Sequence, residues 1–173
     1  MENVVTAAVV IIGNEILSGR TQDKNINYIA LKLGEIGIRL REVRIIPDVE
    51  AVIVDTVNTL RHSYNYVFTC GGIGPTHDDI TSECIARAFG VEYEVNPEAF
   101  MILEKHYPVG EFTPARQKMA MLPRGAGLVL NPVSAAPGFV MENVYVMAGV
   151  PRIMQAMMDN IAVTLKGGDI VHS

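Results

Sequence analysis

The residues with the clearest chemical potential lie in one stretch, FTCGGIGPTHDDIT, which spans Phe68–Thr81. Three glycines occur within Gly71–Gly74, directly after an apolar run, and two adjacent acids, Asp78 and Asp79, follow them. Glycines after a buried strand let the backbone approach a ligand closely, and the free amides of a following helix attract anions. The stretch therefore predicts an anion-binding loop with two carboxylates at its mouth.

Two better-known phosphate-binding loops are excluded by the residues present. A P-loop requires Gly-Lys-Ser/Thr, and no lysine follows Gly74 in this stretch. The dinucleotide-binding fingerprint requires a further glycine, whereas the position three residues after Gly74 is His77. The loop is therefore a different kind of anion site.

Two carboxylates would repel a bound diphosphate unless a divalent cation lay between them. Mg²⁺ commonly takes one or two protein carboxylates together with phosphate oxygens. The pattern predicts a divalent metal (Mg²⁺, Mn²⁺ or Co²⁺) held by Asp78 and Asp79. A structural reading is equally open at this point, in which Thr76 caps a helix and Asp79 returns the hydrogen bond to it. Helix capping by Thr76 and Asp79 does not explain why three glycines precede them.

The elements that must position this loop follow from hydrophobic patterning. Strands are expected over Val4–Ile12, Ile38–Ile46 and Tyr66–Cys70, and helices over Asp23–Gly37, Val49–Leu60 and Ile80–Ala88. This alternation predicts a parallel sheet covered by helices on both faces. Ligands bind such sheets beyond the carboxyl ends of the strands, where the glycine turns at Gly13 and Gly71 lie.

Beyond residue 91 the patterns are shorter. A strand is expected over Val91–Val95, helices over Pro97–His106, Pro114–Met121 and Val150–Leu165, and two or three short strands within residues 127–148. No shift of composition marks a boundary, so residues 1–173 are expected to form a single domain.

The composition narrows the class of protein. With 173 residues, 49% hydrophobic and 19% charged, the chain has a globular composition, and its net charge of −5 argues against a nucleic-acid-binding protein. No apolar run is long enough for a membrane span, and the first 13 residues lack the features of a secretory signal, so a cytoplasmic protein without membrane association is expected. Cys70 and Cys84 fit neither a redox pair nor a zinc site and are expected to be reduced thiols.

The motifs together resemble a known family. GGIGPTHDDIT (Gly71–Thr81) resembles the signature of the molybdopterin-binding domain superfamily, which includes molybdopterin adenylyltransferases and the amino-terminal domain of CinA-type competence/damage-inducible proteins. Resemblance to the CinA branch extends to GNEILSGRTQDKN (Gly13–Asn25), APGF (Ala136–Phe139) and GVPRIM (Gly149–Met154).

The resemblance implies a three-layer α/β/α fold with a mostly parallel, mixed sheet, and a homo-oligomer, either dimer or trimer. It also implies two catalytic acids, Asp79 in the signature and Asp48 after the second strand. The strand pattern independently places Asp48 at a carboxyl end, on the same rim as Asp79. From the glycine turns and the resemblance together, the residues expected to bind substrate are Gly13, Glu15, Asp23, Asn25, Gly71, Gly72, Gly74, Thr76, Ser134 and Gly149. For Asp23 the start of a helix is an equally weighted explanation.

Three functions are compatible with these features. CinA amino-terminal domains are associated with metal-dependent hydrolysis of ADP-ribose, which suits a metal–diphosphate site and would give AMP and ribose 5-phosphate. An adenylyltransferase acting on molybdopterin is the first alternative, although such relatives usually carry arginine where this chain has Asp78. A module that binds a nucleotide or pterin phosphate without converting it is the second. Arg20, Arg116 and Arg152 are further candidates to contact phosphate.

Overall fold

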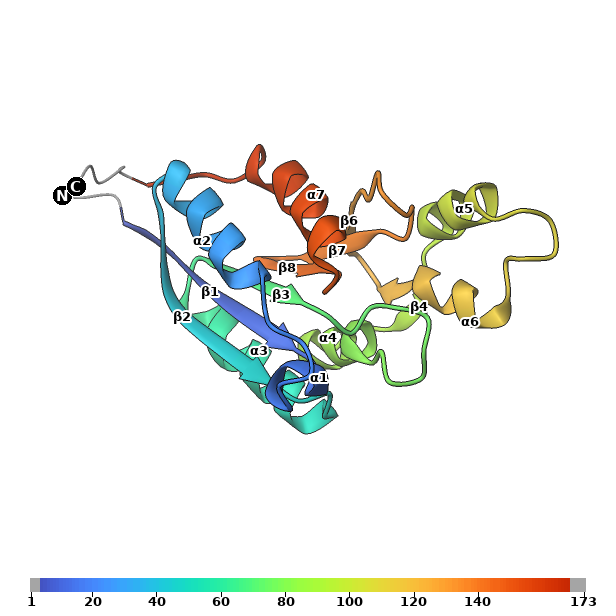
Figure 1. Ribbon diagram of the computed structural model, residues 1–173, viewed down its shortest axis with the longest axis horizontal. Coiled ribbons are helices and arrows are strands. Elements are labelled where there is room, and N and C mark those ends of the chain that lie inside the picture. Colours follow the sequence, from blue (N-terminus) through green and yellow to red (C-terminus); the bar gives the residue numbers. More distant parts are fainter. Residues whose placement is uncertain (1–3, 169–173) are drawn as a thin grey trace.

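The fold is built on a six-stranded sheet, seen edge-on between helices in Figure 1. The computed structural model describes residues 4–168. The strand order is β2-β1-β3-β8-β7-β6; the first four strands are parallel and the last two antiparallel to their neighbours. The strands are β1 (Val5–Ile12), β2 (Ile38–Ile46), β3 (Tyr66–Cys70), β6 (Gly127–Val129), β7 (Gly138–Met141) and β8 (Val144–Met147). The mixed, mostly parallel sheet agrees with the sequence prediction.

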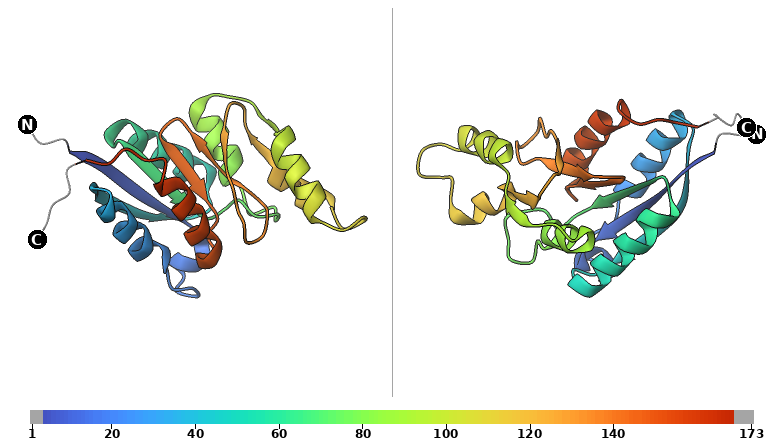
Figure 2. Two further views of the ribbon diagram at one scale, coloured as in Figure 1. Left: turned by 90° about the horizontal axis from the view of Figure 1, so that it is seen from above. Right: turned by 180° about the vertical axis from the view of Figure 1, so that it is seen from behind.

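Helices cover both faces of this sheet, which makes three layers (Figures 1 and 2). One face carries α2 (Asn25–Glu35) and α7 (Pro151–Ala162), and the other carries α3 (Glu50–Ser63) and α4 (Thr81–Phe89). Strand β1 serves both layers because its side chains alternate between faces. Ala7, Val9 and Ile11 join the α2/α7 core, whereas the intervening residues join the α3/α4 core. A continuous apolar run is therefore what this central strand requires.

A smaller lobe stands to one side of the three layers (Figure 1). It contains β4 (Tyr93–Val95), α5 (Pro97–His106), α6 (Pro114–Gln117), the 3-10 turn Lys118–Ala120 and β5 (Met121–Pro123). Strands β4 and β5 pair with each other in a separate antiparallel ribbon. The lobe has its own aromatic cluster, in which Phe112 lies 5.0 Å from Phe100 and 6.0 Å from Tyr107 between ring centroids.

The observed boundaries differ from the predicted ones at a few places. The helix predicted over Pro114–Met121 stops at Gln117, and Met121 belongs to β5, because the chain leaves the helix through a 3-10 turn to pair with β4. The sequence also gave no signal for the one-turn helix α1 (Asn14–Leu17). Within residues 4–168, no helix is long and apolar enough to cross a membrane.

Candidate functional site

The carboxyl ends of the four parallel strands lie on a single rim, where backbone hydrogen bonds link them in pairs. The amide of Gly13, just after β1, donates to the carbonyl of Ile46 at the end of β2 at 3.0 Å. The amide of Gly71, just after β3, donates to the carbonyl of Met147 at the end of β8 at 3.0 Å. These bonds extend the sheet pairing by one residue and bring the predicted turns of Gly13 and Gly71 to the same rim.

Glycine is structurally required at two positions of the loop. Gly71 and Gly72 have φ angles of +106° and +77°, which side-chain-bearing residues rarely adopt. A Cβ on Gly71 would lie 2.2 Å from the carbonyl oxygen of Ile12, and one on Gly72 would lie 2.0 Å from Thr81 Oγ1. The loop therefore packs against β1 and the start of α4, and Gly149 also lies beside it, since a Cβ there would lie 3.3 Å from the Cα of Gly71.

Asp79 closes a turn on itself before helix α4 begins. Its Oδ2 accepts hydrogen bonds from the Thr76 amide at 3.0 Å and from Thr76 Oγ1 at 2.8 Å, and its own amide donates to the Thr76 carbonyl at 3.2 Å. The return bond expected of a capping pair is thus present, but α4 starts only at Thr81, so the pair shapes the loop and does not cap the helix.

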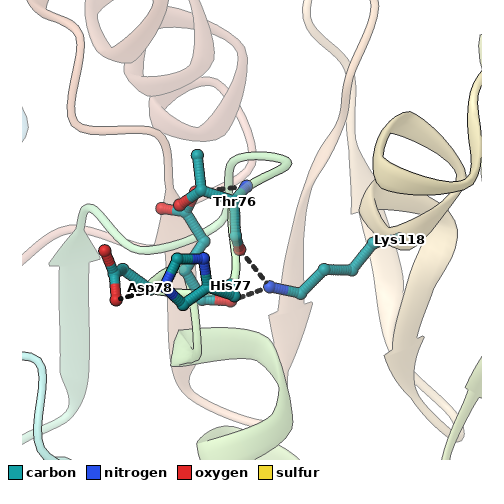
Figure 3. A network of polar contacts seen from close by, with 5 residues as sticks. Thr76, His77, Asp78 and Lys118 are labelled. Atoms are coloured by element: carbon teal, nitrogen blue, oxygen red, sulfur yellow. Dashed lines mark hydrogen bonds and ion pairs between the residues drawn. The ribbon is translucent and has the colours of Figure 1, made fainter.

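Lys118 holds this turn from the neighbouring lobe (Figure 3). Its ammonium donates to the carbonyl of Thr76 and, at 2.6 Å, to the carbonyl of Asp79. Two hydrogen bonds from one cation fix the turn against the 3-10 segment, 39 residues away in sequence. The sequence analysis did not single out Lys118, because nothing local indicates which carbonyls a lysine reaches.

Asp78 is placed differently from Asp79. Its side chain is 80% exposed and lies 3.4 Å from Nε2 of His77, which is itself 94% exposed. Asp79, in contrast, lines a pocket. The two adjacent carboxylates are therefore not presented together as a pair.

The pocket lies beyond the carboxyl ends of β1, β3 and β8 and has a volume of about 620 Å³. Of the predicted residues, it brings together Glu15, Gly71, Gly72, Gly74, Asp79, Arg116, Ser134 and Gly149. It is not lined by Gly13, Arg20, Asp23, Asn25, Asp48, Thr76, Asp78 or Arg152. The lobe contributes Tyr107, Arg116 and Met119, so the pocket lies between the lobe and the three layers.

Asp48 belongs electrostatically to the acids of this rim. The backbone amide of Asn14 donates to Asp48 Oδ2, and the backbone amide of Asp48 donates to Asn14 Oδ1, both at 3.3 Å. Partial burial raises the pKa of Asp48 above its ordinary value, the Asn14 hydrogen bond opposes this, and the negative charges of Glu15, Asp79 and Asp78 raise it further. Asp48 thus braces the turn that carries Glu15 into the pocket.

The oxygen donors on the rim fit only one class of metal site. Among residues 4–168, no three His, Cys, Asp or Glu side chains come together as ligands, so a cation held mainly by protein groups does not fit. The carboxylates of Glu15 and Asp79 in the pocket lining do suit a hard cation such as Mg²⁺, which takes one or two carboxylates and completes its coordination with phosphate oxygens and water.

Asp23 and Asn25 support the edge of the pocket without lining it. Asp23 accepts hydrogen bonds from the amides of Asn25, at 3.2 Å, and Ile26, at 3.0 Å, and so holds the first turn of α2. Asn25 donates from Nδ2 to the carbonyl of Gly149 at 2.9 Å. The helix-start explanation of Asp23 agrees with these contacts. Both residues line a small cavity of about 60 Å³ that shares Glu15 and Gly149 with the main pocket.

Ser134 enters the pocket through a loop that Asn131 organises. The side chain of Asn131 is buried; its Oδ1 accepts from the amides of Val133 and Ser134, each at 3.0 Å, and its Nδ2 donates to Ser134 Oγ at 2.8 Å. Asn131 also lines the pocket and was missed in the sequence, although an asparagine before a proline is a common turn signal.

Comparison with known proteins identifies relatives over almost the whole chain. Residues 8–167 match the family described as probable molybdopterin binding domain. A crystal structure titled as the protein CinA with unknown function from Thermoplasma acidophilum is 32% identical, with a TM-score of 0.85, and the match covers 92% of this chain and 98% of that one.

Two curated relatives are longer than this chain. A protein of Pyrobaculum arsenaticum is 40% identical over 160 residues, which is 89% of this chain and 60% of the relative. A CinA-like protein of Citrifermentans bemidjiense is 38% identical over 158 residues, which is 88% of this chain and 38% of the relative. The chain thus spans only part of the length of these two proteins.

Proposed function

Because the chain belongs to the family of probable molybdopterin-binding domains and is of the CinA type, we propose that its pocket binds a nucleotide and hydrolyses the diphosphate. ADP-ribose is the proposed substrate, and AMP and ribose 5-phosphate are the products. The observation that carries this proposal is that the glycine loop and the carboxylate of Asp79 line the same pocket of about 620 Å³. Pockets of this size hold cofactor-sized ligands.

The loop Gly71–Gly74 is the proposed seat of the diphosphate. Gly72, Ile73 and Gly74 line the pocket, so phosphate oxygens can come within hydrogen-bond distance of their amides, whereas the Gly71 amide already donates to Met147. The turn is fixed in place by Thr76, Asp79 and Lys118, so little ordering accompanies binding.

The acids of the rim are the proposed catalytic groups. Asp79, with Glu15, would hold a divalent cation, which when bound would neutralise charge on the diphosphate oxygens. Water attacks one phosphorus, the bond from that phosphorus to the bridging oxygen breaks, and the proton of the water passes to the acidic cluster. Asp48 lies outside the pocket lining, so it would act on the reaction by holding the turn that carries Glu15. Asp78 reaches the cation only if its side chain turns inward from His77.

A pterin phosphate is a second candidate ligand, favoured by the description of the matched family. In that case the pocket would hold a molybdopterin and the chain would transfer an adenylyl group to it. A module that binds either ligand without turnover is a third candidate, favoured by the hydrogen bonds of Asp79 to Thr76, which give this acid a structural role.

The decisive assay measures AMP release from ADP-ribose by the purified chain with Mg²⁺, Mn²⁺ or Co²⁺, and with chelator. The wild-type chain is expected to release AMP only with metal, and Asp79→Asn is expected to release at least 100-fold less (on the order of the loss of one charged transition-state contact). Asp55→Asn, an exposed acid on α3, is the matched control and is expected to behave as wild type. No AMP from the wild-type chain with any of the metals, or full activity in Asp79→Asn, would overturn the proposal.

A further inference from the structure

One cation of the lobe lines the pocket without forming an ion pair with any acid of residues 4–168. Arg116 lines the pocket from α6, opposite the loop on the three-layer body. Its Nη1 donates to the carbonyl of Glu111 at 2.7 Å, and no carboxylate within residues 4–168 forms an ion pair with it. In a chain of net charge −5 with Glu15 and Asp79 in the same pocket, such a guanidinium is unusual.

An aromatic ring supports this guanidinium. The Cζ of Arg116 lies 4.4 Å from the centroid of the Tyr107 ring, which is cation–π distance. Tyr107 is in turn stacked on Phe112, with an interplanar angle of 9°. The Arg116 amide donates to Thr113 Oγ1, so the backbone of α6 is held as well. Arg116 is thus a flat, preordered group supported from behind by aromatic rings.

The lining of the pocket also contains large apolar side chains. Met119 lies on the same lobe, and Ile73, Val150 and Ile153 face the pocket from the three-layer body. A phosphate would gain from the charge of Arg116 but would lose hydration against these side chains. A flat aromatic ring would be stabilised by both the guanidinium and the apolar side chains. The planar face of arginine stacks on aromatic rings, and apolar side chains cover the edge of the ring.

We infer that Arg116, backed by Tyr107, is the stacking platform for the adenine ring of the nucleotide, and that the lobe thereby selects base-carrying ligands. The inference rests on the proposed function for the placement of the diphosphate on the glycine loop. It is independent of whether the ligand is hydrolysed. In this arrangement the lobe contacts the base and the three-layer body contacts the phosphates.

The test measures affinity by calorimetry for two ligands, AMP and inorganic pyrophosphate, the second of which carries no base. Arg116→Ala is expected to weaken AMP binding by roughly tenfold, which is typical of losing one base-stacking contact, and to leave pyrophosphate binding unchanged. Arg116→Lys keeps the charge but has no planar face, so it is expected to resemble Arg116→Ala.

Arg41→Ala, which removes an exposed arginine of the edge strand β2, controls for the loss of one positive charge. Restoration of AMP affinity in Arg116→Lys, or weaker pyrophosphate binding in Arg116→Ala, would overturn the inference in favour of phosphate recognition. Failure of the wild-type chain to bind AMP would overturn it outright. ADP-ribose that binds with the expected dependence on Arg116 but is not hydrolysed would instead contradict only the proposed reaction.

Discussion

Replacing Gly72 with alanine is the sharpest test of how the glycine loop is built. The new Cβ would lie 2.0 Å from Thr81 Oγ1 and 3.0 Å from Thr81 Cβ, and Thr81 is fully buried at the start of α4. The backbone at Gly72 also has a φ of +77°. A left-handed conformation costs roughly 1–2 kcal/mol for a residue with a side chain and overpacking costs roughly 1–3 kcal/mol, so a loss of about 2–5 kcal/mol is expected.

Gly110→Ala separates these two costs. Gly110 has a similar φ of +87°, but a Cβ there would meet nothing within 4 Å, so only the conformational cost of roughly 1–2 kcal/mol applies. The free energy of unfolding of both variants would be measured in urea, with the slope m checked for constancy. Equal destabilisation of Gly72→Ala and Gly110→Ala would refute the reasoning, because it would mean that α4 yields to the new methyl group without cost.

Three further predictions follow from the contacts around the pocket. Asp48→Asn is expected to raise the free energy of unfolding at pH 7 but not at pH 3. The raised pKa of Asp48 in the folded state means that its charged form is disfavoured in the native protein. Stability is therefore lost as the pH rises from the ordinary pKa of 3.8 through the folded-state pKa. An equal effect at both pH values in urea titrations would count against this. Asp23→Ala should cost about 0.5–2 kcal/mol through the lost amide bonds of α2, again by urea unfolding, and a neutral result would remove its structural role. Lys118→Met should speed hydrogen exchange at the Asp79 amide, whereas Lys105→Met, which removes an exposed lysine, should not; equal rates in both variants would show that Lys118 does not hold the turn.

The sequence predicts the sheet better than the site, for a physical reason. The apolar runs of β1 and β3 are local signals, and the bounds of β2, β3 and α5 agree with the patterns that predicted them. The carboxyl-end rule then places Asp48 and Asp79 on one rim; burial is the main cause of the raised pKa of Asp48, and the charges of Glu15 and Asp79 add to it.

What the sequence does not contain is the position of the lobe. Lys118 reaches the carbonyl of Thr76 across 42 residues, and Arg116 becomes a pocket residue only because the lobe packs beside the glycine loop. Periodicity describes an element and not its neighbour, so the contact of Lys118 could not be inferred, and Arg116 could be named only as one of three candidate arginines. The different surroundings of Asp78 and Asp79 depend in the same way on a turn, in which Thr76 bonds to only one of the two adjacent acids.

The most direct measurement is a crystal structure of the chain with a non-hydrolysable methylene analogue of ADP-ribose and Mn²⁺, located by its anomalous scattering. The account predicts that the diphosphate oxygens lie about 3 Å from amides of Gly72–Gly74, with Mn²⁺ between them and the Asp79 carboxylate. A diphosphate bound away from this loop, or Mn²⁺ without contact to Asp79, would contradict it.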